Sequence, residues 1–233
     1  MATTTVVTKK RRAWTTTVFV KQLMAISGLV FVAFLLFHSY GNLKMFLGPD
    51  AYNGYAQWLH EDAFVPIFPH GGFLMVFRLF MVLFLVVHMA SAFVVWFRSK
   101  RARHTRYVVK KNITNSYAAR TMRISGMVVF FLLVFHILQF TTHTINTWGS
   151  APDTPYGHVI GTFQSPWMVV LYAVFAGAAC LHVSHGFWSA FQSLGWVRAN
   201  TRTFMIVLSG LIGGLIFVMF MAPPVAIAFG ILS

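Results

Sequence analysis

The chain has 233 residues, of which 58% are hydrophobic and only 9% are charged. Soluble domains contain about a quarter charged residues, so this composition excludes an ordinary soluble protein. The formal net charge of +14 would indicate nucleic acid as the partner of a soluble protein, but here the basic residues follow a membrane topology instead.

Apolar runs of about 20 residues recur along the chain, each long enough to cross a hydrocarbon layer of about 30 Å. Runs of this length satisfy their backbone hydrogen bonds in lipid as helices. The expected fold is therefore all-α, a polytopic membrane protein with five transmembrane helices. The expected spans are 23–47, 71–97, 124–146, 166–190 and 204–231.

The segment before the first span is rich in threonine and then basic, which predicts a cytoplasmic tail over residues 1–22 and a membrane domain over 23–233. The first apolar run is expected to be retained, because it has no small-residue cleavage site and four more spans follow. The single cysteine, Cys180, excludes an internal disulfide and a cysteine-ligated iron–sulfur cluster.

Sixteen of the 18 lysines and arginines lie on one side of the expected spans, the exceptions being Lys44 and Arg78. All four acidic residues lie in the two opposite loops. The positive-inside rule therefore predicts a cytoplasmic N-terminus and an external C-terminus. A protein partner or anionic lipid at the inner face explains the charge, and nucleic acid is not expected as a partner.

An internal repeat relates the first span to the third. Met24–His38 and Met122–His136 align without gaps at an offset of 98 residues, and each reads Ile-Ser-Gly, nine residues, then His. Each is followed by a returning span with a further histidine, His88 in one and His182 in the other. This predicts a duplicated two-helix unit plus a fifth helix, with a functional site between the halves.

Histidines within the membrane are costly and mark functional candidates. Six of the ten lie in the expected spans, and the other four are expected in solvated loops. The six are His38, His88, His136, His143, His182 and His185, and the four are His60, His70, His104 and His158.

The helical rise of about 1.5 Å per residue gives each intramembrane histidine a depth. His38 and His136 form an outer pair, roughly 20–25 Å above the inner surface, and His88 and His182 form an inner pair at about 15 Å. A b haem needs two imidazoles from separate helices on one iron, so four histidines at two levels predict two stacked haems. Spacing alone does not separate His182 from His185.

Other residues at these two levels have predicted roles. Ser27-Gly28 and Ser125-Gly126 lie at the inner level, where the missing glycine side chain would let a porphyrin approach. Arg78, ten residues before His88, lies at the outer level and could meet a haem propionate or a quinone oxygen. Zinc is not favoured, because no level gathers three or four suitable ligands.

Three short stretches share their order and spacing with a known family: Ser27–Leu43, Leu47–Asn53 and His182–Ser189. On these residues the chain resembles the single-subunit, five-helix, two-haem cytochrome b membrane anchors of succinate dehydrogenase and fumarate reductase. The likeness covers nearly the whole chain after the tail. It implies that His182, four residues before the Gly of Gly-x-Trp-Ser, ligates the inner haem, and that His185 tunes that haem instead.

The resemblance also implies the remaining ligands, a location and a set of partners. His38, His88 and His136 fall where the family has its other ligands, and the location would be a bacterial cytoplasmic membrane. A flavoprotein subunit and an iron–sulfur subunit would dock at the inner face, on the basic segment 98–123. Electrons would pass through both haems to or from menaquinone. The dicarboxylate chemistry would belong to the partners, in either direction, and the redox chemistry to the cofactors.

The quinone site has several candidate residues, each with an ordinary structural explanation as well. They are Arg78, His143, His70 and Glu61 near the outer haem, and Lys21, Ser27 and Arg123 near the inner face. In the outer loop Leu47–Leu59, Tyr52 and Tyr55 lie at helical spacing with further apolar residues, which predicts a short amphipathic helix that covers the outer haem.

Two other functions stay open. The anchor of a hydrogenase, formate dehydrogenase or nitrate reductase also carries two bis-histidine haems, but it lacks the Ser-Gly frame and the Gly-Pro-Asp loop found here. A proton-coupled or metal transporter would also use intramembrane histidines. The expected spans contain no Asp or Glu, which most such relays employ.

Overall fold

A computed structural model describes residues 16–102 and 113–233, with the backbone alone for 113–120. These residues form helices and no strand, and five of the helices are long and apolar enough to cross a membrane, which confirms the expected fold class. The long helices are α1 (Thr17–Leu43), α3 (Gly72–Arg101), α4 (Ile113–Phe140), α6 (Pro166–Ser193) and α7 (Arg202–Ala228). Three short ones are η2 (Lys44–Leu47), α2 (Pro49–Glu61) and α5 (Pro155–Phe163).

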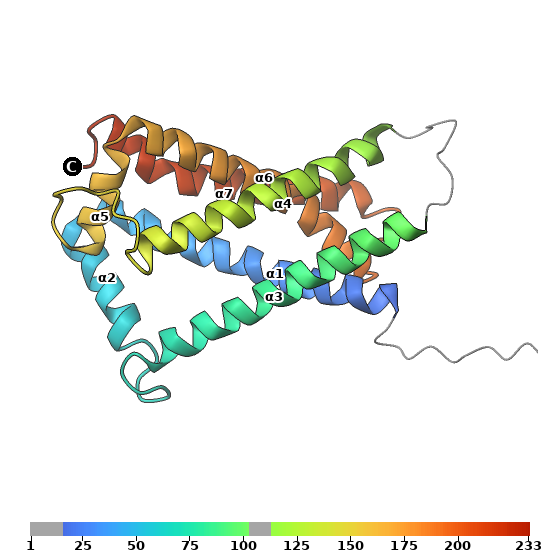
Figure 1. The fold of residues 1–233 in the computed structure, drawn as a ribbon, viewed down its shortest axis with the longest axis horizontal. Helices are drawn as coiled ribbons and strands as arrows, with labels where there is room; N and C mark the ends of the chain where they lie inside the picture. Colours follow the sequence, from blue (N-terminus) through green and yellow to red (C-terminus); the bar gives the residue numbers. More distant parts are fainter. Residues whose placement is uncertain (1–15, 103–112) are drawn as a thin grey trace, which may run out of the picture.

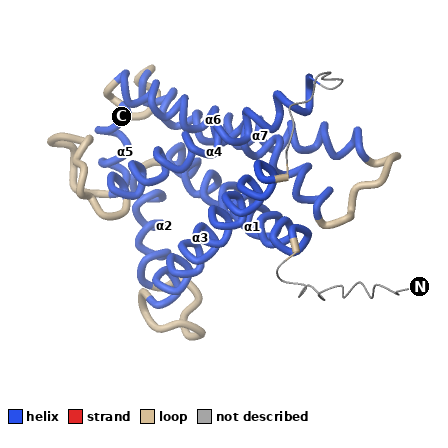
Figure 2. Tube along the Cα trace, turned by 45° about the vertical axis from the view of Figure 1, so that its right-hand side comes forward, coloured by secondary structure: helices blue, strands red, loops and turns tan. Residues whose placement is uncertain are grey.

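The long helices run along the longest axis of the molecule, and α2 and α5 cover one end together with the C-terminus (Figure 1). The connections lie at the helix ends (Figure 2). In the bundle, α1 packs on α3 and α4 packs on α6, while α1 and α6 also contact each other and α7. This is the arrangement expected of two related helix pairs and a fifth helix.

The outside of the bundle carries large apolar side chains. On α3, for example, Leu79, Val82, Leu83 and Val86 are each more than half exposed. A continuous patch of this kind is a liability in water, whereas a bilayer covers it with hydrocarbon at no cost.

Charge divides the two ends of the described structure. Lys44 and the four acidic residues lie at the end that α2 and α5 cover, which we call the outer end. The opposite end carries Arg98, Lys100 and Arg101 on α3, Arg198 in the loop between α6 and α7, and Arg202 at the start of α7. The tail residues Lys9 to Arg12 and His104 lie outside the described residues, as do four of the nine basic residues of segment 98–123, namely Arg103, Arg106, Lys110 and Lys111.

Helix α4 ends earlier than expected, which corrects the expected position of His143. The amides of Thr141 and Thr142 both bond to Ile137 O, and the helix stops at Phe140, six residues before the expected boundary. His143 therefore lies in a loop, with φ +53°, and not in a transmembrane helix. Polar side chains satisfy the backbone of this loop, as where Asn146 Oδ1 accepts from two following amides.

Helix α1 begins at Thr17, six residues earlier than expected, because Thr16 caps it by accepting from the Phe19 amide at 3.2 Å. The short helix expected in the outer loop is also present, as α2. Gly48, whose φ of +93° favours glycine, is the N-cap residue, and the helix begins at Pro49.

Helices α2 and α5 form a cap over the outer end. The ring of Tyr55 lies against Gly41 of α1, where an added Cβ would be 3.0 Å from the ring. Asn53 Oδ1 accepts from the Tyr156 amide of α5 at 2.9 Å. His158, expected in a solvated loop, lies in α5 and is buried, with Nε2 2.7 Å from Asp153 Oδ1. Thr154 caps α5 and starts this helix where a loop was expected.

Candidate functional site

Four histidines on four different helices meet in two pairs. The ring centres of His38 (α1) and His136 (α4) are 6.0 Å apart, with the ring planes at 75°. Those of His88 (α3) and His182 (α6) are 6.2 Å apart, at 70°. These are the outer and inner pairs expected from depth. His182, and not its neighbour His185, is the residue whose ring contacts His88 in the described structure.

A serine on the adjacent helix holds the His88 ring. Ser27 Oγ lies 2.8 Å from Leu23 O and 3.1 Å from His88 Nδ1. The hydroxyl has one hydrogen, which it donates to a backbone carbonyl, so it accepts from His88 Nδ1–H. With the proton on Nδ1, the lone pair of Nε2 is available to a metal ion.

The second half of the repeat builds the same contact. Ser125 Oγ lies 3.3 Å from Met122 O and 3.4 Å from His182 Nδ1. The same assignment of donors makes Ser125 the acceptor for His182 Nδ1–H. The duplication therefore preserves a tertiary contact between successive membrane helices as well as a sequence pattern.

The glycines after these serines face the histidine rings. A Cβ on Gly28 would lie 3.3 Å from His88 Cε1, and one on Gly126 would lie 3.0 Å from His182 Cε1. Both distances are shorter than an ordinary van der Waals contact. The sequence led us to expect a porphyrin against these glycines, and the structure places the imidazole rings there.

The outer pair has a different hydrogen-bond partner. Tyr172 of α6 donates its hydroxyl hydrogen to Gln139 Oε1 at 2.6 Å and so accepts from His136 Nδ1–H at 3.1 Å. The amide nitrogen of Gln139 in turn donates to Thr162 Oγ1 at 3.2 Å and to Thr147 Oγ1. A chain of hydrogen bonds thus runs from the His136 ring to the loop that follows α4.

Sequence reasoning missed Tyr172 and Gln139, although both left a signal. Gln139 is a fully buried amide in an otherwise apolar run, one turn beyond His136. Tyr172 stands ten residues before His182, as Arg78 stands ten residues before His88. Arg78 has no acceptor atom and cannot play the part of Tyr172 in the first unit.

The His38 ring has aromatic neighbours. Phe34 stacks on it at 5.2 Å with the planes only 9° apart, and Phe220 of α7 lies 5.6 Å away. Within the described residues no hydrogen bond to this ring is recorded. Three of the four rings therefore have Nδ1 fixed by a partner, while aromatic packing holds the fourth.

The spacing within each pair suits two imidazoles bound to opposite sides of one metal ion. A metal–imidazole bond of about 2 Å on each side puts the ring centres about 6 Å apart. The described residues contain no group of three or more His, Cys, Asp or Glu that could hold a metal. A haem brings its own equatorial nitrogens and needs only two axial residues, so each pair fits haem and does not fit structural zinc.

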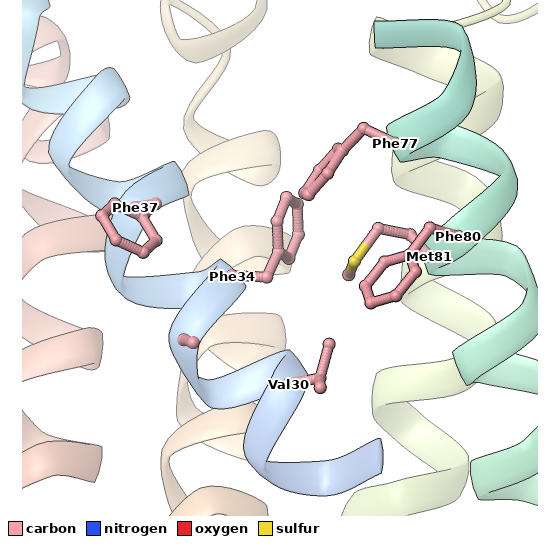
Figure 3. Close-up of a pocket in the computed structure, with 7 residues that line it drawn as sticks. Val30, Phe34, Phe37, Phe77, Phe80 and Met81 are labelled. Carbon is pink, nitrogen blue, oxygen red and sulfur yellow. The ribbon is translucent and has the colours of Figure 1, made fainter. Parts of the chain in front are cut away.

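An apolar groove of about 210 Å³ lies between α1 and α3 beside the outer pair (Figure 3). Side chains from both helices line it, and Phe34 connects it to the His38 ring. The lining side chains are Val30, Ala33, Phe34 and Phe37 on α1, and Phe77, Phe80 and Met81 on α3. These walls suit one edge of a flat apolar ring system.

The structure does not bring the remaining outer candidates to the histidine pairs. His143 contacts Trp148 and His158, with ring centres 5.3 and 4.8 Å away. His70 bonds to Asp62 at 3.0 Å and Glu61 accepts from Gln57 at 3.2 Å, all on the surface.

The charged candidates Arg78 and Arg123 are both exposed. Partial burial lowers the pKa of His60 on α2. The nearby charge of Arg78 lowers this pKa further, by a smaller amount. Arg123 lies on α4 two residues before Ser125. Lys21, the remaining inner candidate, is exposed on the first turns of α1.

No protein-family model, no curated protein and no solved structure matches the chain.

Proposed function

We propose that the chain is a two-haem cytochrome b that anchors a succinate:menaquinone oxidoreductase, a succinate dehydrogenase or fumarate reductase, in the membrane. The observation that carries this proposal is the pair of histidine contacts, at ring-centre distances of 6.0 and 6.2 Å, from four separate membrane helices. Helix-to-helix bis-histidine ligation in a bundle core is a recurrent way of holding a b haem.

His38 and His136 would hold the outer haem, and His88 and His182 the inner one. Bound haem iron supplies reversible one-electron transfer. The contribution of the chain is orientation: Ser27 and Ser125 keep the inner rings in the Nδ1–H tautomer and Tyr172 does the same for His136. Acceptors of this kind also make the ligating nitrogen more basic.

Support for the dehydrogenase partners comes from the resemblance and from charge. The described inner end carries the cations of α3, of the loop between α6 and α7, and of the start of α7, which suit an acidic partner surface or anionic lipid. An iron–sulfur subunit with its flavoprotein would dock there and exchange electrons with the inner haem. Menaquinone would react near the outer haem, where Arg78 is the charged candidate on α3.

A reduced-minus-oxidised visible spectrum of the purified protein tests the haem proposal. We expect b-type bands and two haems per chain. The absence of these bands would refute the proposal and favour the transporter alternative, and one haem per chain would refute the pairing. Copurified flavin and iron–sulfur subunits would support the dehydrogenase, whereas a hydrogenase or a molybdenum partner would indicate another respiratory complex.

Substitution of the two neighbouring histidines of α6 tests the ligand assignment. His182→Ala should remove the inner haem and keep the outer one, because His182 is the ring in contact with His88. His185→Ala is the matched control, one turn away on the same helix, and should keep both haems. Loss of the inner haem in the control alone would reverse the assignment.

A further inference from the structure

Two buried indole nitrogens, on partly buried tryptophans, have no hydrogen-bond partner in the described structure. They are Nε1 of Trp96 on α3 and Nε1 of Trp188 on α6. A buried indole N–H almost always donates to an acceptor, since leaving it unpaired is costly. Two such groups near the same end of the bundle therefore point to an acceptor that the chain itself does not supply.

Both tryptophans lie on the inner side of the inner histidine pair. Trp96 is eight residues beyond His88 and Trp188 is six beyond His182, or about 12 and 9 Å along their helices. They come from the two helices that supply the inner rings. An acceptor that both could reach would extend from the inner pair toward the cytoplasmic end.

Each of these rings also has a cation over it. Lys100 Nζ lies 4.3 Å from the ring centre of Trp96, and the Arg202 guanidinium carbon lies 5.8 Å from that of Trp188. Two unpaired donors with two adjacent cations favour an anionic acceptor over a neutral one. In the opposite direction along α3 and α6 lies the apolar middle of the membrane, where a carboxylate would be costly.

We infer that Trp96 and Trp188 form a carboxylate-binding site for the propionate groups of the inner haem, with Lys100 and Arg202 as the balancing cations. This inference rests on the proposed function, because it requires a haem between His88 and His182. It gives a positioning role to Trp96 and to Trp188, the tryptophan of the Gly-x-Trp-Ser motif, to neither of which the repeat or the resemblance assigned a role. The neutral alternative, a quinone oxygen, is an outcome of the test.

The test uses the full chain in its complex and the variants Trp96→Phe, Trp188→Phe and the double variant. The matched control is Trp167→Phe, an exposed tryptophan at the outer end of α6. Potentiometric titration measures the midpoint potential of each haem, and resonance Raman spectroscopy measures the propionate bending bands. Benzothienylalanine at the same two positions keeps the shape of the ring and removes only the N–H, which separates hydrogen bonding from folding.

Loss of the donors leaves the propionate charge less compensated and stabilises ferric haem. We expect a lower midpoint potential and shifted propionate bands for the inner haem, with the outer haem and the Trp167→Phe control unchanged. Unchanged potential and bands in the double variant and the benzothienyl protein would overturn the inference, as would altered quinone affinity with unchanged bands. A wild-type protein without b haem would overturn the proposed function itself.

Discussion

At Gly28 and Gly126 a single hydrogen atom leaves room for an imidazole ring of the neighbouring helix. A methyl group at Gly126 would stand 3.0 Å from His182, closer than the 3.3 Å between one at Gly28 and His88. We therefore expect Gly126→Ala to deplete the inner haem more than Gly28→Ala does, as measured by haem content per chain. Gly210→Ala is the control, because nothing lies within 4 Å of its Cβ and alanine favours a helix by about 1 kcal/mol. A full complement of both haems in Gly126→Ala would contradict the close contact.

The serines before these glycines accept hydrogen bonds from the inner histidines, and removal of one hydroxyl oxygen tests this role. Ser27→Ala or Ser125→Ala removes the acceptor of a buried Nδ1–H, which costs roughly 1–3 kcal/mol. Loss of such a partner weakens metal binding roughly 10–100-fold, so we expect faster loss of the inner haem and a higher midpoint potential. Ser209→Ala provides the comparison, because its buried hydroxyl bonds to Ile206 O on its own helix. Equal effects in all three variants would indicate a general packing defect.

Between elements, Tyr172 links α6 to α4 beside the outer pair. Tyr172→Phe leaves His136 Nδ1–H and Gln139 Oε1 without their shared partner, while the ring keeps its shape. We expect the potential of the outer haem to change and that of the inner haem to stay the same, in a spectroelectrochemical titration. Tyr40→Phe, at an exposed position on α1, should change neither. A shift of the inner haem in Tyr172→Phe would show that the hydrogen bond does not act locally.

The cap formed by α2 and α5 should become less stable at alkaline pH. Burial, with a smaller contribution from Tyr55, raises the pKa of Tyr52 from 10.0 to about 12. Between these pKa values the folded protein keeps a proton that the unfolded chain loses. The free energy of unfolding is therefore unaffected by this group below pH 10 and falls by about 2–3 kcal/mol as the pH rises to about 12. Thermal unfolding in detergent between pH 9 and 12 should show this fall. Tyr52→Phe should reduce it, and Tyr40→Phe should not.

The same elements show what hydropathy and spacing can predict. Five spans follow from composition, and the two pairs follow from a repeat read at a fixed rise per residue. The early end of α4 does not, because it depends on side chains that satisfy backbone groups there: Thr142 donates to Leu138 O, and Asn146 accepts from the Trp148 amide. The contact of Ser27 with His88 joins residues 61 apart, and that of His136 with Tyr172 joins residues 36 apart. Helix rotation and packing decide such contacts, and periodicity does not report them.

At the scale of the whole molecule, the proposed docking face and the order in which electrons would reach the two proposed haems depend on which end lies in the cytoplasm. The excess of basic residues opposite α2 and α5 predicts that this basic end is cytoplasmic. In a Cys180→Ser background, Ser150→Cys should react with a membrane-impermeant maleimide on intact cells, whereas Ser99→Cys should react only after permeabilisation. Both positions are exposed, Ser150 in the loop before α5 and Ser99 near the end of α3. The opposite labelling pattern would place the inner pair on the external side, away from a cytoplasmic iron–sulfur partner, and would reject the dehydrogenase assignment. The two histidine pairs would still fit haem.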